Sequence, residues 1–281
     1  MISLVVPAHN EAPVIGRLLR SVLAGARPGE FEVVVVPNGC TDDTARVAAS
    51  FGDPVQVVTL DRPGKYAALR AGDERAAGDE VIYVDADVEL GTEDVRRLAA
   101  ALREPGVLAV APERVVATGR SSWPVRWYYD IWQELPGVRE GLFGRGVIGV
   151  SPQARRRLRA LPDVMGDDLA ASVAFTPAER RVVPGSRVVV HAPRSLGDLL
   201  RRRIRSVTAT SQLQQALPQG TVESARTSRA DLIGILRRRP AAAPKLAVFL
   251  AVTLVTRWRA RRPISSGDYT TWLRDESSRA A

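Results

Sequence analysis

Short apolar runs alternate with amphipathic stretches through the first ninety residues, and this alternation limits the fold more than any other feature. The runs are short enough to indicate buried strands rather than helices. They occupy residues 2–6, 32–36, 55–59 and 81–84. The intervening stretches repeat their apolar residues at helical spacing. We therefore predict an α/β fold, with a mostly parallel central sheet flanked by helices and joined by right-handed crossovers.

Two aspartates, Asp85 and Asp87, close the fourth apolar run. Side chains at i and i+2 share a face when a strand continues, and ligands of open α/β sheets collect at the carboxyl ends of strands. Paired carboxylates there suit a hard divalent cation such as Mg²⁺ or Mn²⁺, which in turn binds a diphosphate. The alternative interpretation is an acidic turn that follows a strand and has no ligand.

Polar residues also follow the other predicted strands. His9, Asn10 and Glu11 come after the first strand, Asn38 after the second, and Lys65 after the third. Each of them alone is most simply a polar loop residue. Because the carboxyl ends of parallel strands meet at one edge of a sheet, the four loops together favour a binding site.

The composition narrows the class of ligand. The chain has 281 residues, 45% of them hydrophobic, which suffices for one large α/β domain with an appendage. Its net charge of +9 favours an anionic partner, namely nucleotide phosphates, a membrane surface or nucleic acid. Neither G-x-G-x-x-G nor G-x-x-x-x-G-K-[ST] is present, which argues against a dinucleotide-binding domain and a P-loop. With Cys40 as the one cysteine and no visible secretory signal, we expect a cytoplasmic protein.

Four segments together resemble the family 2 glycosyltransferases, which have the GT-A fold. They are LVVPAHNEAPVIGRLLRSV, EVVVVPNGCTDDTARVA, GKYAALRAG and VDAD, which matches the D-x-D of that family. The resemblance covers residues 1–90 closely and continues more weakly to about residue 215. Two positions depart from the family pattern, since His9 replaces a common tyrosine and Asn38 a common aspartate.

The resemblance implies a nucleotide-diphosphate sugar as donor, most often linked to UDP. By position, Pro7 to His9 would line the base, Glu11 would reach the ribose, and Asn38 would contact the base edge. The residues implied for the nucleotide sugar are Pro7, Ala8, His9, Glu11, Asn38, Lys65, Asp85, Ala86, Asp87, Arg203 and Arg205. Those implied for Mg²⁺ or Mn²⁺ are Asp85, Asp87 and His191.

A second acidic pair, Asp167 and Asp168, resembles the family's acceptor-side motif, in which the second acid is the catalytic base. Inverting transfer needs a carboxylate to take the proton of the acceptor hydroxyl, although acids also commonly cap helices. The run Arg201–Arg205 resembles the Q-R-x-R-W element of processive members, with Arg203 and Arg205 matching. These arginines either neutralise a diphosphate or form a solvated basic helix face.

We divide the chain into a catalytic domain (residues 1–215), a helical segment (216–263) and a polar tail or lid (264–281). Residues 1–111 would bind the nucleotide sugar and residues 112–215 the acceptor. The apolar run 246–256 is too short to cross a bilayer, which needs ~20 residues. We expect residues 244–262 to lie on an anionic membrane surface; a buried helix in a domain or dimer interface is the alternative.

The sequence thus predicts an inverting, metal-dependent glycosyltransferase. The acceptor would carry a free hydroxyl and would be lipid-linked if the enzyme sits at the inner face of the cell membrane. A sugar nucleotidyltransferase is the alternative enzyme, but it would need a glycine-rich phosphate loop after the first strand. A nucleic-acid-binding module is the non-enzymatic alternative; no known motif supports it, and we expect no nucleic acid partner. A homodimer remains open.

Overall fold

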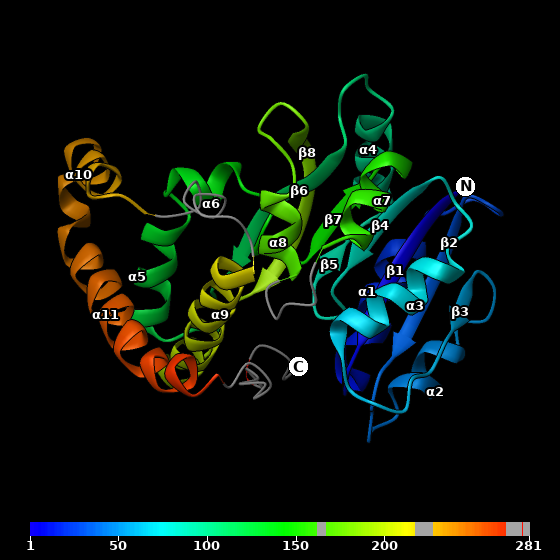
Figure 1. The fold of residues 1–281 in the computed structure, drawn as a ribbon, viewed down its shortest axis with the longest axis horizontal. Coiled ribbons are helices and arrows are strands. Elements are labelled where there is room, and N and C mark those ends of the chain that lie inside the picture. Colours follow the sequence, from blue (N-terminus) through cyan, green and yellow to red (C-terminus); the bar gives the residue numbers. More distant parts are fainter. Residues whose placement is uncertain (162–166, 217–226, 268–276, 278–281) are drawn as a thin grey trace.

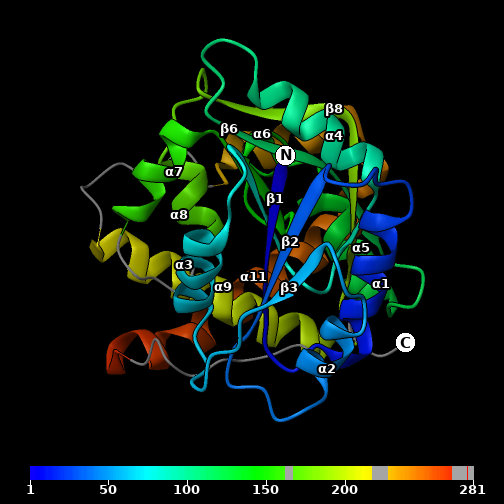
Figure 2. The same cartoon turned by 90° about the vertical axis from the view of Figure 1, so that its right-hand side faces the viewer.

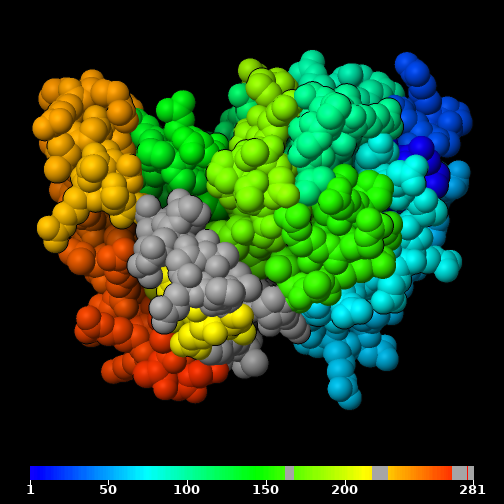
Figure 3. Space-filling model, turned by 45° about the horizontal axis from the view of Figure 1, so that its top comes forward, coloured from blue at the N-terminus to red at the C-terminus, as the bar shows by residue number. Residues whose placement is uncertain are grey.

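The computed structural model describes residues 1–161, 167–216, 227–267 and 277, and its centre is a curled mixed sheet (Figure 1). Within these residues the sheet has eight strands in the order β3-β2-β1-β4-β7-β6-β8-β5. The α/β class and the helical C-terminal appendage predicted from the sequence are both confirmed. The N-terminal strands and the C-terminal helices lie at opposite ends of the molecule (Figure 3).

The N-terminal half of the sheet forms as predicted. Its strands are β1 (Ile2–Ala8), β2 (Phe31–Pro37), β3 (Val55–Val57) and β4 (Glu80–Val84). Its helices are α1 (Ala12–Leu23), α2 (Thr44–Ala49) and α3 (Lys65–Arg75). These four strands pair in parallel, and every residue of β1 and β2 is buried. Such burial on both faces explains why the strands read as continuous apolar runs rather than as alternating patterns.

Helices cover both faces of this sheet. Figure 2 shows α3 on one side with α7 (Pro152–Arg159) and α8 (Asp167–Val173), and α1 on the other with α4 (Thr92–Leu102). Apolar residues of α1 and α4 share one core with the strands, whereas α3, α7 and α8 pack into another. The carboxyl ends of the parallel strands β1, β2 and β4 point to the same edge of the sheet.

The second half of the sheet departs from the parallel pattern. Its strands are β5 (Glu89–Leu90), β6 (Ala109–Ala117), β7 (Val147–Val150) and β8 (Arg180–His191). β7 runs antiparallel to both β4 and β6, and β5 antiparallel to β8, while β6 and β8 are parallel. Four of the seven strand pairings are thus parallel. Because β7 runs against β4, the loop that precedes β7 lies beside the aspartates that follow β4.

The C-terminal helices pack on one another and on the second half of the sheet domain. They are α5 (Trp123–Trp132), α6 (Pro136–Glu140), α9 (Leu196–Ala216), α10 (Arg229–Arg238), a 3₁₀ turn (Pro240–Ala242) and α11 (Ala243–Ser266). One apolar cluster joins α5, α9, α10 and α11, and it includes Tyr128, Tyr129 and Phe249. Of the aromatic residues of α5, Tyr128 and Tyr129 are therefore core, whereas Trp123 is 55% exposed. The predicted boundary at residues 263–264 falls inside α11, and the predicted lid lies largely outside the described residues.

Candidate functional site

Asn38 ties three of the strand-end loops together. Its Nδ2 donates to the carbonyl oxygens of Ala8, at 2.9 Å, and Val36, at 3.2 Å. Its Oδ1 accepts from the backbone N–H of Gly64 at 3.0 Å, and its carbonyl oxygen lies 2.6 Å from His9 Nδ1. The side chain is 3% exposed. Both amide N–H groups are thus engaged within the protein, so the predicted contact with a base edge would use the remaining capacity of Oδ1.

The loop after β2 passes very close to the loop before α3. Gly39 has a φ of +56°, and a Cβ there would stand 2.4 Å from the nitrogen of Pro63. Only glycine allows this approach. On the other side, Glu11 is the N-cap residue of α1 and is 7% exposed. The loop after β2 is therefore fixed by its contact with Pro63, and the loop after β1 ends at the buried Glu11.

Lys65 and Asp85 form an ion pair at the carboxyl end of β4, with Nζ 2.7 Å from Oδ1. The backbone N–H of Asp85 donates to the carbonyl oxygen of Gly146 at 2.7 Å. Gly146 has a φ of +67°, and a Cβ there would meet Val88 Cγ1 at 2.7 Å and Asp85 Oδ2 at 3.2 Å. The glycine therefore lets the loop before β7 pack directly against the first aspartate of the D-x-D. Ala86, between the two aspartates, is buried.

The second aspartate lies beside a small charged cluster. Arg17 Nη2 donates to the carbonyl oxygen of Asp87 at 3.4 Å, and Arg17 Nε lies 3.4 Å from Glu89 Oε1. His191 Nε2 is 2.7 Å from the same Glu89 oxygen. In this arrangement the Nε2 atom of His191 faces Glu89, so its predicted role as a metal ligand would use Nδ1 or would require Nε2 to leave that contact.

The donor set of this edge fits a hard cation through two protein ligands. Among the described residues no group of three or more histidine, cysteine, aspartate or glutamate side chains is arranged to hold a metal. Mg²⁺ commonly uses one or two carboxylates, with substrate phosphates and waters filling the other positions. Asp85 and Asp87 match that pattern, and the remaining oxygen ligands would come from a diphosphate and water.

Asp168 is held at the start of α8 by two backbone N–H groups. Its Oδ2 accepts from Gly144 at 2.7 Å, and its Oδ1 accepts from Leu169 at 2.8 Å. These two bonds fix the orientation of the carboxylate. Met165 and Gly166, which precede the acidic pair, lie outside the described residues. Asp168 thus faces the loop that also contacts Asp85.

Two arginines, the half-buried Arg114 and the buried Arg145, support this loop, and no motif in the sequence indicated either of them. Arg114 donates to the carbonyl oxygens of Phe143, Gly144 and Val138, and its guanidinium carbon lies 4.3 Å from the centre of the Trp132 ring. Burial, followed by the nearby Arg145 guanidinium, lowers the pKa of Arg114 to about 9.

Arg145 donates to four carbonyl oxygens, among them Gly141 and Pro112, and burial lowers its pKa to about 10. Both arginines remain charged at neutral pH, and Arg114 lies near enough to Asp168 to interact with its charge. Residues 141–149 also contain four glycines. They allow the chain to pack closely within the protein, because a Cβ at each would crowd a neighbouring atom.

The arginines of α9 face the second half of the domain. Arg202 Nη1 donates to the carbonyl oxygen of His191 at 3.2 Å, and the Arg203 guanidinium carbon lies 5.8 Å from the centre of the Tyr128 ring. The predicted contact of Arg203 and Arg205 with a diphosphate stays a prediction.

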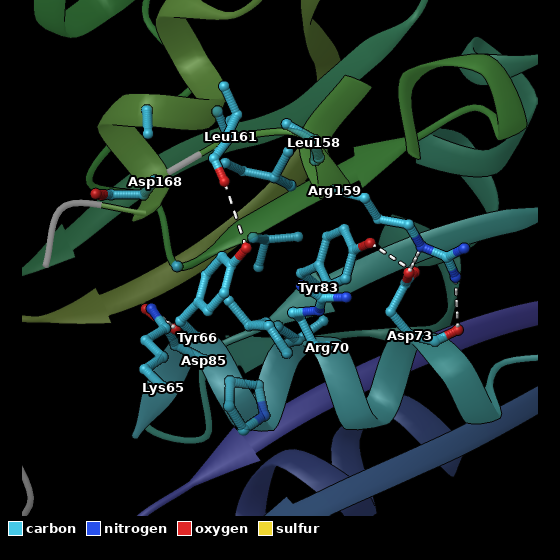
Figure 4. A pocket seen from close by; sticks show the side chains of 18 residues that line it. Lys65, Tyr66, Arg70, Asp73, Tyr83, Asp85, Leu158, Arg159, Leu161 and Asp168 are labelled. Atoms are coloured by element: carbon cyan, nitrogen blue, oxygen red, sulfur yellow. Dashed lines mark hydrogen bonds and ion pairs between the residues drawn. The ribbon is translucent and has the colours of Figure 1, made fainter. Parts of the chain in front are cut away.

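A cavity of about 110 Å³ connects the two acidic sites (Figure 4). Its lining includes Pro7, Lys65 and Asp85 from the donor half and Asp168 from the acceptor half. Tyr66, which the sequence analysis did not single out, stands between them and donates to the carbonyl oxygen of Leu161 at 3.3 Å. The structure thus brings Lys65, Asp85 and Asp168 to one hollow at the edge of the sheet.

Comparison with known proteins identifies the family. A family model described as "Glycosyl transferase family 2" matches residues 3–152, which is more than half of the chain. The chain belongs to glycosyl transferase family 2. It is 35% identical over 195 residues to an uncharacterized glycosyltransferase of Mycobacterium bovis, covering 67% of this chain and 82% of that protein.

Other relatives in this family are longer. The chain is 38% identical over 106 residues to an undecaprenyl-phosphate 4-deoxy-4-formamido-L-arabinose transferase of Pseudomonas fluorescens, covering 35% of this chain. It spans 31% of that protein and 45% of the corresponding transferase of Pseudomonas savastanoi. The chain therefore spans less than half the length of these relatives.

Solved structures confirm the GT-A fold. A mannosyltransferase from Pyrobaculum calidifontis, in complex with GDP-Man and Mn²⁺, superposes with a TM-score of 0.60 at 20% identity, covering 94% of this chain and 84% of that chain. Glucosyl-3-phosphoglycerate synthase from Mycobacterium tuberculosis, in complex with Mn²⁺ and UDP, gives 0.56 at 22% identity, covering 78% and 82%. At these identities the likeness concerns the fold.

Proposed function

We propose that this family 2 member transfers a sugar from a nucleotide-diphosphate donor, with UDP favoured, to an acceptor hydroxyl with inversion at the anomeric carbon. The observation that carries the proposal is the cavity shared by the Lys65–Asp85 pair and Asp168. A donor held by the strand-end loops would present its sugar between these two sites. The proposal also agrees with the relatives, which are named as sugar transferases.

Asp168 would act as the general base. Its carboxylate would accept the proton of the acceptor hydroxyl as the oxygen attacks the anomeric carbon and the bond to the diphosphate breaks. The N–H groups of Gly144 and Leu169 would hold its two oxygens in place for this step. Rotation of the carboxylate is restricted by the same two bonds, so the proton acceptor is oriented before substrate binds.

Asp85 and Asp87 would hold Mg²⁺ or Mn²⁺ through their carboxylates. When bound, the cation would neutralise charge on the leaving diphosphate. Two solved relatives of this fold contain Mn²⁺ together with a nucleotide or nucleotide sugar, which supports a divalent cation here. Lys65, 2.7 Å from Asp85, would add positive charge on the same side of the donor.

We further propose that the enzyme is cytoplasmic and binds the inner face of the membrane through α11, where it would meet a lipid-linked acceptor. One face of α11 packs on α5 and α9, whereas Leu250, Leu254, Val255 and Trp258 are exposed by 40%, 66%, 38% and 65%. The helix continues into the exposed arginines at positions 257, 259, 261 and 262. An apolar face beside cationic residues suits an anionic leaflet.

Two findings bear on whether α11 lies on the membrane surface or crosses the bilayer. The 3₁₀ turn and α11 together form one helical segment, Pro240–Ser266. By length and composition alone, this segment could cross a bilayer. Of its most apolar stretch, 28% is buried inside the protein. The apolar run 246–256 alone is too short to cross a bilayer. We favour a surface location because the buried face of α11 belongs to the core that it shares with α5 and α9. The relatives named for undecaprenyl-phosphate support a lipid-linked acceptor.

A flotation assay tests the membrane proposal. The full chain should float with anionic vesicles at low salt, and rising salt should weaken the binding. The double substitution Leu254→Asp and Trp258→Asp should release the protein. Ile233→Asp, which changes an exposed apolar residue of α10, is the matched control and should not. If the unaltered chain stays in the soluble fraction, the membrane proposal fails.

A donor screen tests the catalytic proposal. We expect UDP or a UDP-sugar to raise the melting temperature in the presence of Mn²⁺, and EDTA to cancel the effect. Slow hydrolysis of one UDP-sugar without acceptor should follow the same metal dependence. If neither UDP nor any other nucleoside diphosphate stabilises the protein with Mn²⁺ or Mg²⁺, the proposed function is wrong.

A further inference from the structure

The cavity that connects Asp85 with Asp168 has an extended apolar wall. Its walls come from α3, β4, β7, α7 and α8. The apolar members of its lining are Pro7, Leu69, Val84, Val147, Ile148, Leu158, Leu161, Ala170 and Ala171. Leu69, Leu158 and Leu161 keep part of their surface exposed, so their apolar surface around the hollow is not fully covered by protein.

Several polar groups in the lining are already bonded within the protein. Tyr66, at the side that faces Asp85 and Asp168, donates its hydroxyl to the carbonyl oxygen of Leu161 at 3.3 Å (Figure 4). At the opposite side Tyr83 donates to Asp73 Oδ1 at 2.8 Å. Asp73 in turn accepts from the Nε atoms of Arg155 and Arg159, each at 2.5 Å. A hydroxyl group placed inside would therefore have to compete for these partners.

The position of the cavity indicates which substrate reaches it. Its walls include α3 and β4, whose ends carry Lys65 and Asp85, and the lining includes Pro7 at the end of β1. Under the proposed function, these are the elements that hold the donor. Asp168 lies on the far side, where the acceptor hydroxyl would approach. A substituent on the donor sugar thus has the shortest route into the hollow, past Tyr66.

We propose that this cavity binds an apolar substituent of the donor sugar, such as an N-acyl group or the methyl group of a 6-deoxy sugar. The inference rests on the proposed function and names the class of donor. The volume of about 110 Å³ is several times what one water molecule needs, so a small acyl or alkyl group fits. The N–H or ring oxygen next to such a substituent would stay at the rim, near the Tyr66 hydroxyl.

Donor-binding measurements on the full chain with Mn²⁺ test the inference. The probes are UDP, UDP-glucose, UDP-N-acetylglucosamine and UDP-6-deoxyglucose. We expect at least one substituted donor to bind about fivefold or more tightly than UDP-glucose, the scale of burying one or two carbon atoms. Ala171→Leu, which fills the cavity from α8, should remove this advantage and leave the affinity for UDP unchanged.

Two further variants complete the test: a second cavity-filling substitution, in case the first does not fold, and a control outside the cavity. Leu158→Phe fills the same cavity from α7, so it should reproduce the effect if Ala171→Leu does not fold. Ala174→Leu, directly after α8 and outside the lining, is the matched control and should keep the preference. If no substituted donor binds more tightly than UDP-glucose, or if the preference survives both filling variants, the inference is wrong. If neither UDP nor any other nucleoside diphosphate binds, the proposed function itself is overturned instead.

Discussion

The donor and acceptor halves of the site are held in place by different kinds of contact. In the donor half, short side chains such as Asn38 join neighbouring strand-end loops to one another. In the acceptor half, the long side chain of Arg114 reaches from β6, and that of Arg145 turns back from the same loop, to the carbonyl oxygens of residues 138–144. Buried guanidinium groups can span such distances and bond several carbonyls at once, which short side chains cannot.

This difference suggests that the two halves have separate roles, one in binding the donor and the other in turnover. The donor loops are rigid because their backbones contact each other directly, as at Gly39 and Pro63. The acceptor loop owes its shape to two buried cations, and through Gly144 it orients Asp168. Changes in the donor half should therefore act on metal and nucleotide binding. Changes in the acceptor half should act on turnover and leave donor affinity intact.

The largest effect is expected from Asp87→Asn. Loss of a metal carboxylate should lower sugar transfer by about 10³-fold or more, since metal ions supply several kcal/mol and each ~1.4 kcal/mol is tenfold in rate. Metal-dependent stabilisation by UDP should disappear with it, which places the effect in the donor half. Asp79→Asn, at an exposed turn before β4, is the control and should be neutral. Full activity of Asp87→Asn, or of the unaltered chain in EDTA, would contradict the metal assignment.

Asp168→Asn should lower turnover by about 10²-fold or more, the usual scale of general-base catalysis. Donor affinity should stay unchanged, because the amide oxygen can still accept from Gly144 and only the proton acceptor is lost. The measurement is turnover at saturating donor beside direct titration of UDP. The assignment is wrong if donor affinity collapses while turnover at saturation survives, because Asp168 would then belong to the donor half.

Arg114→Gln should have a smaller effect, a loss in turnover of about tenfold. Gly144 would lose a donor to its carbonyl oxygen, and a displaced loop would turn Asp168 away from the attacking hydroxyl. Affinity for UDP should not change, which separates a positioning role from general destabilisation. Arg97→Gln is the matched control, since Arg97 also donates to a glycine carbonyl, at Gly185. If Arg114→Gln lowered turnover and UDP affinity equally, the acceptor half would not act on turnover alone, and the proposed difference between the two halves would be wrong.

The contrast also explains what the sequence could predict. Each donor-side strand is a short apolar run that ends at a polar residue, so Asn38, Lys65 and Asp85 could be assigned to one edge before the fold was known. The acceptor side depends on contacts between distant segments. Nothing in the pattern of β6 indicates that Arg114 bonds carbonyls 24 to 30 residues away. His191 could be recognised as a strand-end residue, but its contact with Glu89, 102 residues away, could not.

The smallest effects should come from surface ion pairs, and these should be alike in the two halves. The Arg96 guanidinium lowers the pKa of Glu30 in the donor half to about 2, and Arg157 does the same for Glu179 in the acceptor half. A carboxylate whose pKa is lower in the folded state stabilises the fold above its unfolded pKa. This stabilisation is therefore complete above about pH 4.5 and is lost as the pH falls toward about 2.

Glu30→Gln and Glu179→Gln should each lower the melting temperature slightly at pH 7 and flatten its decline between pH 4.5 and 2. Both pairs are partly exposed, so the surrounding water weakens each interaction to a similar degree. Melting temperatures measured from pH 7 to pH 2 would check this, with activity at pH 7 expected to be unchanged in both variants. A much larger loss for Glu179→Gln would mean that surface charge as well as buried arginine holds the acceptor half together.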